Sequence, residues 1–142
     1  MRIGMLLAGV ILCAAGAQRS LADSAATRSI ADGVFSEQQK KRGMSAYMKE
    51  CSGCHGETLR GGESSPPLKG PDFMAHWNGR TLEDLFSKMQ LMPPNEPGRL
   101  SVDQTADVIA AVLAANGYPA GAADLPADPQ QLRQIHIVEP RP

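Results

Sequence analysis

The segment Cys51-Ser52-Gly53-Cys54-His55 decides how the rest of this sequence is interpreted. Two cysteines separated by two residues and followed at once by a histidine form the attachment signature of a c-type haem. At this spacing both thiols can add to vinyl groups of one porphyrin, and the adjacent imidazole can bind the iron from one face of the ring. The segment therefore predicts one covalently attached haem c, with Cys51 and Cys54 as the thioether residues and His55 as an axial ligand of the iron.

Other interpretations of the two cysteines are weaker. A zinc site generally needs four ligands, and only His76 and His136 remain as distant candidates. A thioredoxin-type dithiol requires a βαβ context, which the surrounding sequence lacks. An oxidising compartment would allow a disulfide between the cysteines, but a histidine directly after the pair favours haem attachment.

The first 22 residues have the features of a secretory signal peptide. Arg2 supplies a positive charge, and residues 3–17 form an apolar stretch that is short for a membrane span. Small residues precede two suitable cleavage sites, and we expect cleavage after Ala22, with an uncleaved anchor as the alternative. The sequence therefore predicts an exported, periplasmic protein without a stable membrane span after processing. Export suits haem attachment, since c-type haem is generally attached outside the cytoplasm in such proteins.

Length and composition set bounds on the class of protein. A chain of 142 residues is enough for one ordinary domain. The formal charge is −1 and becomes more negative when Arg2 and Arg19 leave with the signal peptide, which argues against a nucleic-acid partner. Aromatic residues make up only 4% of the chain, so its own core is modest and a buried porphyrin would add apolar area.

Helix-start signals predict three main helices and no confident strand. The expected helices run from residue 36 to about 50, from 81 to the region of Pro93, and from 101 to the stop signal at Asn116-Gly117. A short fourth helix is expected from 128 to about 135. Residues 56–80 contain several Gly and Pro pairs and predict a long loop. The three main starts have capping-box pairs: Ser36 with Gln39, Thr81 with Asp84, and Ser101 with Gln104.

These signals predict an all-α protein with a single globular domain. Residues 23–35 are expected to form a flexible N-terminal arm, residues 36–117 the domain itself, and residues 118–142 a C-terminal extension packed on it. Gly43 lies inside the first helix, where glycine is unfavourable, and is better explained if another helix crosses closely there.

Met92 is the leading candidate for the second axial ligand of the iron. It stands at the end of a helix, where Pro93 turns the chain away. A thioether opposite an imidazole raises the reduction potential and leaves no open position for a substrate. Met89, one helical turn earlier, is the main rival, and His76 is a third alternative. Met74 is expected to be core filler.

The haem segment together with Met92-Pro93 resembles the class I cytochrome c family. Gly43-x-x-x-Tyr47 looks like the motif of that family's N-terminal helix, which crosses the C-terminal helix. The resemblance implies a fold of about three main helices around one haem, with long loops. It places the crossing partners on the last main helix, at Ile109, Ala110 and Leu113.

The resemblance also implies which residues lie near the haem. Pro66-Pro67-Leu68 is similar to the family segment in which a proline carbonyl accepts the hydrogen bond from the free imidazole N–H. Either Pro66 or Pro67 could be the acceptor, and Pro67 is expected to belong to the haem environment. Trp77 is expected to touch the haem or bind a propionate, or else to be a partly buried core residue. Arg80 is a weaker propionate candidate.

The stretch from residue 92 to 101, with 116–119 and 125–128, is similar to one subgroup of the family. These are cytochrome c domains that accompany, or are fused to, quinoprotein alcohol dehydrogenases. The resemblance implies an electron carrier and not an enzyme, with a separate quinoprotein dehydrogenase as donor and a further cytochrome or an oxidase as acceptor. The alternatives are a haem subunit of a larger dehydrogenase complex, and a haem sensor or peroxidase-like protein with an open distal site.

Overall fold

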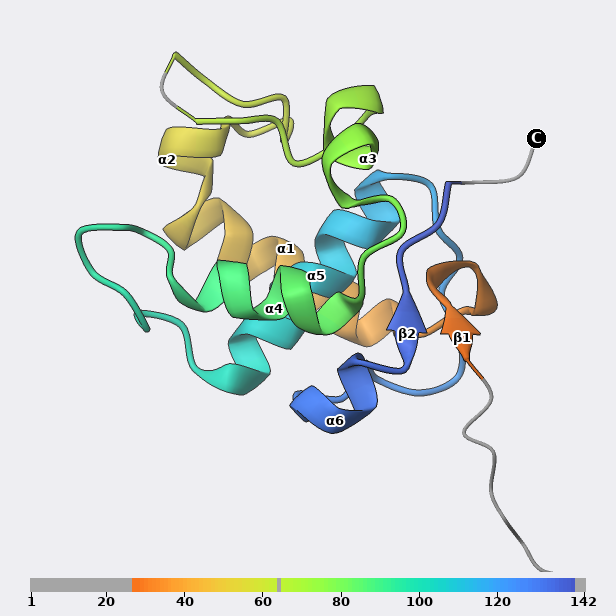
Figure 1. Cartoon of the computed structure of the whole chain (residues 1–142). Coiled ribbons are helices and arrows are strands. Elements are labelled where there is room, and N and C mark those ends of the chain that lie inside the picture. Colours follow the sequence, from red (N-terminus) through yellow and green to blue (C-terminus); the bar gives the residue numbers. More distant parts are fainter. Residues whose placement is uncertain (1–26, 64, 140–142) are drawn as a thin grey trace, which may run out of the picture.

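The computed structural model describes residues 27–63 and 65–139, so the expected signal peptide lies outside the described residues. The helices surround a single core, and the sheet consists of two short strands (Figure 1). The predicted all-α fold class is confirmed. In chain order the elements are β1 (Arg28–Ser29), the 3₁₀ helix η1 (Ile30–Asp32), α1 (Glu37–Glu50), α2 (Ser52–His55), α3 (Pro71–Trp77), α4 (Leu82–Gln90), α5 (Val102–Ala115), α6 (Pro129–Leu132) and β2 (Ile135–His136).

The main helices α4 and α5 begin where their capping boxes predict. The Thr81 hydroxyl accepts a hydrogen bond from Asp84 N, and the Asp84 carboxylate accepts one from Thr81 N. Ser101 and Gln104 make the same reciprocal pair at the start of α5. Each box satisfies backbone N–H groups that the first helical turn leaves unpaired.

The capping box expected at the start of α1 is incomplete. Ser36 Oγ accepts from Gln39 N at 3.0 Å, as predicted. The Gln39 side chain does not return to Ser36. Its Nε2 donates to Leu125 O at 3.0 Å and its Oε1 accepts from Leu125 N at 2.6 Å. Gln39 is buried under the C-terminal segment, so its amide satisfies both backbone groups of a residue that is distant in sequence.

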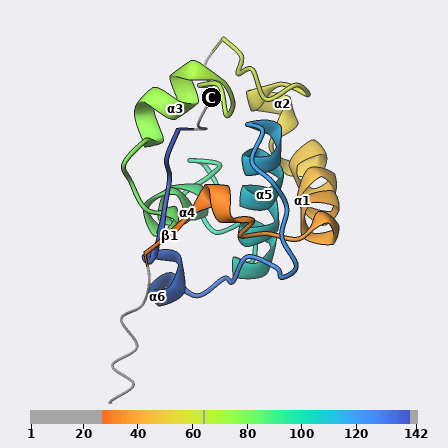
Figure 2. The same ribbon diagram turned by 90° about the vertical axis from the view of Figure 1, so that its right-hand side faces the viewer.

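Helices α1 and α5 cross at Gly43, as the glycine predicted. A Cβ atom at this position would lie 1.7 Å from Asp107 O, so only glycine allows the two backbones to approach this closely. The nearest backbone is that of Asp107 and Val108, slightly earlier in α5 than the partners implied by the resemblance. Figure 2 shows α1 and α5 side by side, with α3 and α4 on the other side of the molecule.

The expected flexible arm is wrong for the described residues 27–35. Ile30 and Phe35 are fully buried and Val34 is nearly so. β1 pairs in parallel with β2, which brings the two ends of the described chain together (Figure 1). Three apolar side chains without helical or strand spacing gave no periodic signal, yet all three enter the core.

The long loop expected at residues 56–80 contains one helix, α3. Pro71 occupies its first position and Asp72 its first turn, both favourable at a helix start. Phe73, Met74 and Trp77 are buried and attach α3 to the core. The start signal was present in the sequence, but a helix this short has too few residues for a clear period.

Residues 118–139 pack on the helical core through buried apolar side chains. Their short helix ends at Leu132, before the expected end near residue 135, because Ile135 pairs with β1 instead. The backbone of Ile137 then makes two hydrogen bonds to the turn after α3: its carbonyl oxygen accepts from Gly79 N, and its N–H donates to Arg80 O, each at 2.8 Å. None of the helices in the described part of the chain is long and apolar enough to span a bilayer.

Candidate haem-binding site

A cavity of about 530 Å³ opens between α2, α3, α4 and the loops that follow them. This volume is within the range of roughly 300–1,000 Å³ that is usual for small-molecule and cofactor sites. Its walls are mostly apolar, and a few polar and sulfur-containing groups enter it. The residues that line it include Cys51, Cys54, His55, Pro66, Pro67, Leu68, Phe73, His76, Trp77, Leu85, Lys88, Met89, Met92 and Leu100.

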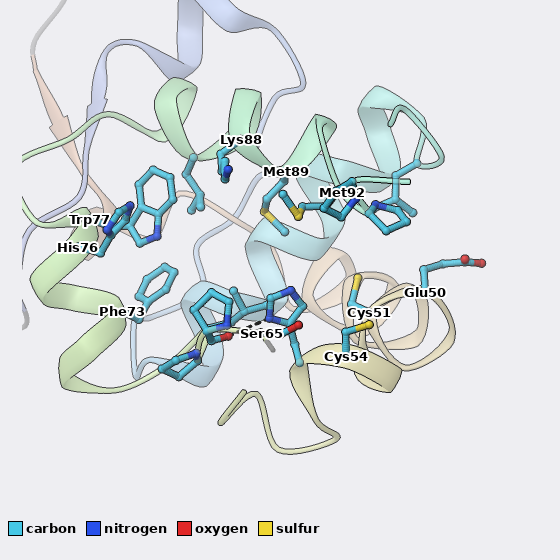
Figure 3. A pocket seen from close by; sticks show the side chains of 18 of the residues that line it. Glu50, Cys51, Cys54, Ser65, Phe73, His76, Trp77, Lys88, Met89 and Met92 are labelled. Carbon is cyan, nitrogen blue, oxygen red and sulfur yellow. Dashed lines mark hydrogen bonds between the residues drawn. The ribbon is translucent and has the colours of Figure 1, made fainter. Parts of the chain in front are cut away.

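The two cysteines lie together at one edge of this cavity. Helix α2 is a single turn in which Cys54 N and His55 N both donate to Cys51 O, at 3.2 and 2.9 Å. Both thiols are free, and Figure 3 shows their sulfur atoms at the same edge. Burial raises the pKa of Cys51 to about 11, so this thiol is protonated at neutral pH in the chain without haem.

The hydrogen bond of His55 selects its tautomer. His55 Nδ1 lies 2.9 Å from Pro66 O. A carbonyl oxygen can only accept, so Nδ1 carries the hydrogen and donates it. Nε2 is then left with its lone pair available for a metal ion, and the orientation of the ring is held by Pro66. The structure therefore distinguishes the two prolines: Pro66 is the acceptor, and Pro67 contributes to the cavity wall.

The loop that carries Pro66 is held by backbone hydrogen bonds close to His55. Gly61 N donates to His55 O, and Leu68 N donates to Leu59 O, both at 2.9 Å. Gly61 has φ +81°, and a Cβ there would lie 2.6 Å from Ser65 O. A glycine at this position is thus required both by its backbone conformation and by the close approach of the chain.

Tyr47 supports the same side of the site from α1. Its ring is fully buried, and its hydroxyl donates to Gly56 O at 2.6 Å. Gly56 directly follows His55. The aromatic residue of the first helix therefore holds the end of the haem segment as well as filling the core.

Two methionines enter the cavity from the α4 side. Figure 3 shows the thioethers of Met89 and Met92 directed into the cavity. Met92 N donates to Met89 O at 3.0 Å, so the two residues are one turn apart at the end of α4. An imidazole and two thioethers thus reach the cavity from different elements, and they could hold the iron of a haem bound there.

The end of the cavity formed by α3 is aromatic. Phe73 and Trp77 are buried there, and the guanidinium carbon of Arg80 lies 5.5 Å from the centre of the Trp77 ring. His76 meets the Trp77 ring edge-on, with ring centres 4.9 Å apart. Trp77 is therefore both a core residue and a cavity wall. Arg80 stacks on Trp77 and is not among the described residues that line the cavity.

Sequence reasoning missed several residues of this site. Phe73 and Lys88 line the cavity from α3 and α4, and Glu50 and Arg99 also line it. Lys88 directly precedes Met89 and Glu50 directly precedes Cys51, so adjacency to the candidate ligands was the available signal. No such signal exists for Arg99, which lies close to Glu50 only in the folded chain.

The donor set fits a covalently attached haem. It combines two free thiols one turn apart, an imidazole whose Nε2 is free, and thioethers entering a mostly apolar cavity from another element. Among residues 27–63 and 65–139, no group of three or more His, Cys, Asp or Glu side chains is arranged to hold a metal ion.

Comparison with known families gives one match. The model of the family described as "Cytochrome C oxidase, cbb3-type, subunit III" matches residues 38–110. This range covers α1 except its first residue, α2 to α4 with the haem segment, and part of α5. Comparisons with curated proteins and with solved structures show no significant match.

Proposed function

The chain belongs to this family of class I c-type cytochrome domains, and we propose that it is a monohaem electron carrier of the periplasm. Membership of the family implies a covalently bound haem, a role in electron transfer, and redox proteins as partners. The proposal adds a single haem, ligation of its iron by His55 and Met92, and transfer of single electrons between separate proteins. Haem bound in this way supplies a one-electron couple that needs no open coordination position.

One observation carries the proposal: His55 donates through Nδ1 to Pro66 O beside the two free thiols. The thiols would hold the porphyrin covalently, and Pro66 would keep the His55 ring orientated so that Nε2 could bind its iron. The apolar walls exclude water, which keeps the site in a low-dielectric environment and influences its potential.

Met92 is the better candidate of the two methionines for the other face. Met89 belongs to α4, and its side chain packs against the hydrophobic core. Met92 lies beyond the C-cap residue Leu91, in a segment that does not continue the helix. Its thioether can therefore reach an iron without withdrawing a side chain from the core.

The location and partners of the protein are part of this proposal. The signal-peptide features of residues 1–22 favour export to the periplasm. The resemblance of residues 92–101 to cytochromes that accompany quinoprotein dehydrogenases favours such an enzyme as the electron donor. A further cytochrome or an oxidase is the acceptor we propose, in keeping with the oxidase named in the family description.

A spectroscopic and redox study of the full-length, haem-loaded protein tests the proposal. We expect one haem per chain, a one-electron potentiometric titration, and the weak far-red charge-transfer band of a thioether bound to Fe(III). Cyanide should bind the ferric protein slowly and weakly, since both axial positions are filled. Absence of the band together with ready cyanide binding would instead support a sensor or peroxidase-like protein. Obligate co-purification with a dehydrogenase would support a complex subunit.

A further inference from the structure

The loop formed by residues 91–100 carries Met92, and of its residues only Leu100, at its end, belongs to the buried core. Most of its residues are exposed. Its backbone hydrogen bonds are local. Leu91 N donates to Lys88 O at 3.2 Å and Met92 N to Met89 O at 3.0 Å, both at the end of α4. Glu96 N donates to Pro93 O at 2.9 Å, and Gly98 N donates to Gln90 O at 2.8 Å. These bonds lie within the loop or join it to the end of α4. They do not connect it to the side of the cavity that carries Cys51 and His55.

An ion pair makes that connection. Arg99 Nε lies 2.6 Å from Glu50 Oε2, and Glu50 is the last residue of α1, directly before Cys51. In the part of the chain that the structure describes, this is the one ion pair that joins the loop to another element, since the other ion pair of Arg99 is with Glu96. Both Glu50 and Arg99 are among the residues that line the cavity.

The buried oxygen Oε2 of the Glu50 carboxylate has Arg99 as its charged partner. The side chain is 12% exposed, and its Oε2 is buried with no hydrogen bond of regular geometry among the described residues. A buried carboxylate oxygen of this kind is unfavourable unless a nearby positive charge compensates it. Lys49 is also close, at 3.2 Å from Oε1, but it is 82% exposed and belongs to α1 itself.

The charge of Glu50 is present at neutral pH. Hydrogen bonding to Lys49 and the positive charge of Arg99 hold the pKa of Glu50 below its ordinary value, against the opposite effect of burial. Figure 3 shows Glu50 beside the cysteine edge of the cavity, with its carboxylate directed away from Met89 and Met92. The ion pair therefore joins the loop to the end of α1, beside the cysteine edge of the cavity.

We propose that the Glu50–Arg99 ion pair is a clasp that closes the loop of residues 91–100 over the cavity. Arg99 is thus a positioning residue for Met92, and this role rests on the proposed ligation of the iron by His55 and Met92. The clasp joins the two walls of the site directly, because its acidic partner precedes the first haem-attaching cysteine. Loss of the clasp raises the population of an open loop in which Met92 has left the iron.

Imidazole binding to the ferric, full-length haem protein tests the clasp. An external ligand binds only when Met92 is displaced, so its apparent affinity reports the population of the open loop. For Arg99→Gln we expect an imidazole affinity about three to ten times higher than in the parent protein, since a partly shielded charge pair has been removed. The far-red thioether band should weaken, and hydrogen exchange should become faster in residues 91–100.

Lys49→Gln is the matched control. It removes one positive charge from the same carboxylate without touching the loop, so its imidazole affinity should stay within about twofold of the parent value. Arg99→Lys should restore part of the effect, because it keeps the charge. Glu50→Gln removes the acidic partner of the same ion pair. The double variant Glu50→Gln with Arg99→Gln should bind imidazole with about the same affinity as either single variant, because both substitutions remove one interaction.

Specific outcomes overturn the clasp. Equal effects of Arg99→Gln and Lys49→Gln would show that only net charge matters. An unchanged imidazole affinity in Arg99→Gln, while Met92→Ala opens the iron, would leave the proposed function standing and remove the clasp. If Met92→Ala itself fails to open the iron, the ligand assignment is wrong, and the clasp is rejected with it.

Discussion

The two walls of the cavity are built in different ways. The wall that carries Cys51, Cys54 and His55 is continuous in sequence from residue 47 to 68, and neighbouring backbone groups hold it at several points. The wall that carries Met89 and Met92 consists of a helix end and an exposed loop. Its tie to the first wall is the contact between Glu50 and Arg99.

This difference indicates how each ligand is held. On the first wall, loss of one contact leaves several others, so the imidazole should keep its place in most variants. On the second wall, the thioether is held by few contacts, so small changes should displace it. We expect the two sides of the iron to differ in robustness, and the following variants test this comparison from the largest expected effect to the smallest.

Removal of both attachment thiols should have the largest effect. In Cys51→Ala with Cys54→Ala, the haem has no covalent bond to the chain, and the first wall loses its link to the porphyrin. A denaturing gel stained for haem peroxidase activity should show no coloured band at the size of the protein. A band of parental intensity would contradict the assignment of the attachment site. The matched variant Cys54→Ala alone should keep one thioether bond and part of the stain.

Removal of the Met92 thioether should have the next largest effect. Met92→Ala should lower the reduction potential by roughly 0.1 V or more, since axial ligands tune haem potentials over about 0.8 V. It should also open the ferric iron to imidazole and cyanide. Met89→Ala, which removes core packing from the same turn, should reduce stability and leave the potential and the far-red band nearly unchanged. If Met89→Ala lowers the potential and opens the iron while Met92→Ala does not, the axial ligand is Met89.

Two glycine-to-alanine variants compare how closely the backbone is packed in the two walls. Gly61 and Gly98 both have positive φ, but a Cβ at Gly61 meets Ser65 O at 2.6 Å, whereas the position at Gly98 faces open space. Gly61→Ala should therefore cost about 3 kcal/mol or more of unfolding free energy, from strain and overlap together. Gly98→Ala should cost about 1 kcal/mol, from backbone strain alone. Urea unfolding of the haem-loaded proteins measures both, and equal costs would show that the first wall is no tighter than the second.

Loss of one hydrogen bond should have the smallest effect. Tyr47→Phe removes the donor to Gly56 O while keeping the buried ring, so the free energy of unfolding should fall by about 1 kcal/mol. The far-red band should persist, because the remaining contacts of the first wall still hold His55. Tyr118→Phe, which removes a donor to Val138 O in the C-terminal segment, is a control of similar chemistry away from the haem segment. Disappearance of the band in Tyr47→Phe alone would show that the first wall is as easily disturbed as the second.

Features that depend on neighbouring residues were predictable from the sequence. The starts of α4 and α5 follow from the Thr81–Asp84 and Ser101–Gln104 pairs, because a capping box involves residues three apart. Gly43 predicted the crossing of two helices, although not the residues it meets in α5. Met92 and Met89 were both recognised, because each occurs near the end of a helix that the sequence predicts.

Features that depend on distant residues were not predictable. Gln39 has the side chain of a capping box but binds Leu125, which approaches only when the C-terminal segment packs on α1. Ile30, Val34 and Phe35 belong to the core, although their spacing matches neither a helix nor a strand. In both cases the contacts are made with residues that are far away along the chain.

By itself, the sequence determined the chemistry of the haem segment: two thiols and an imidazole occur within five residues, in an order that a covalently held haem explains. It also determined the main helices, since their caps and apolar spacing are local. The tertiary structure decided which proline carbonyl accepts from His55, how β1 pairs with β2, and how Arg99 reaches Glu50. These features require the folded backbone, because each joins groups whose distance is set by packing and not by their separation in sequence.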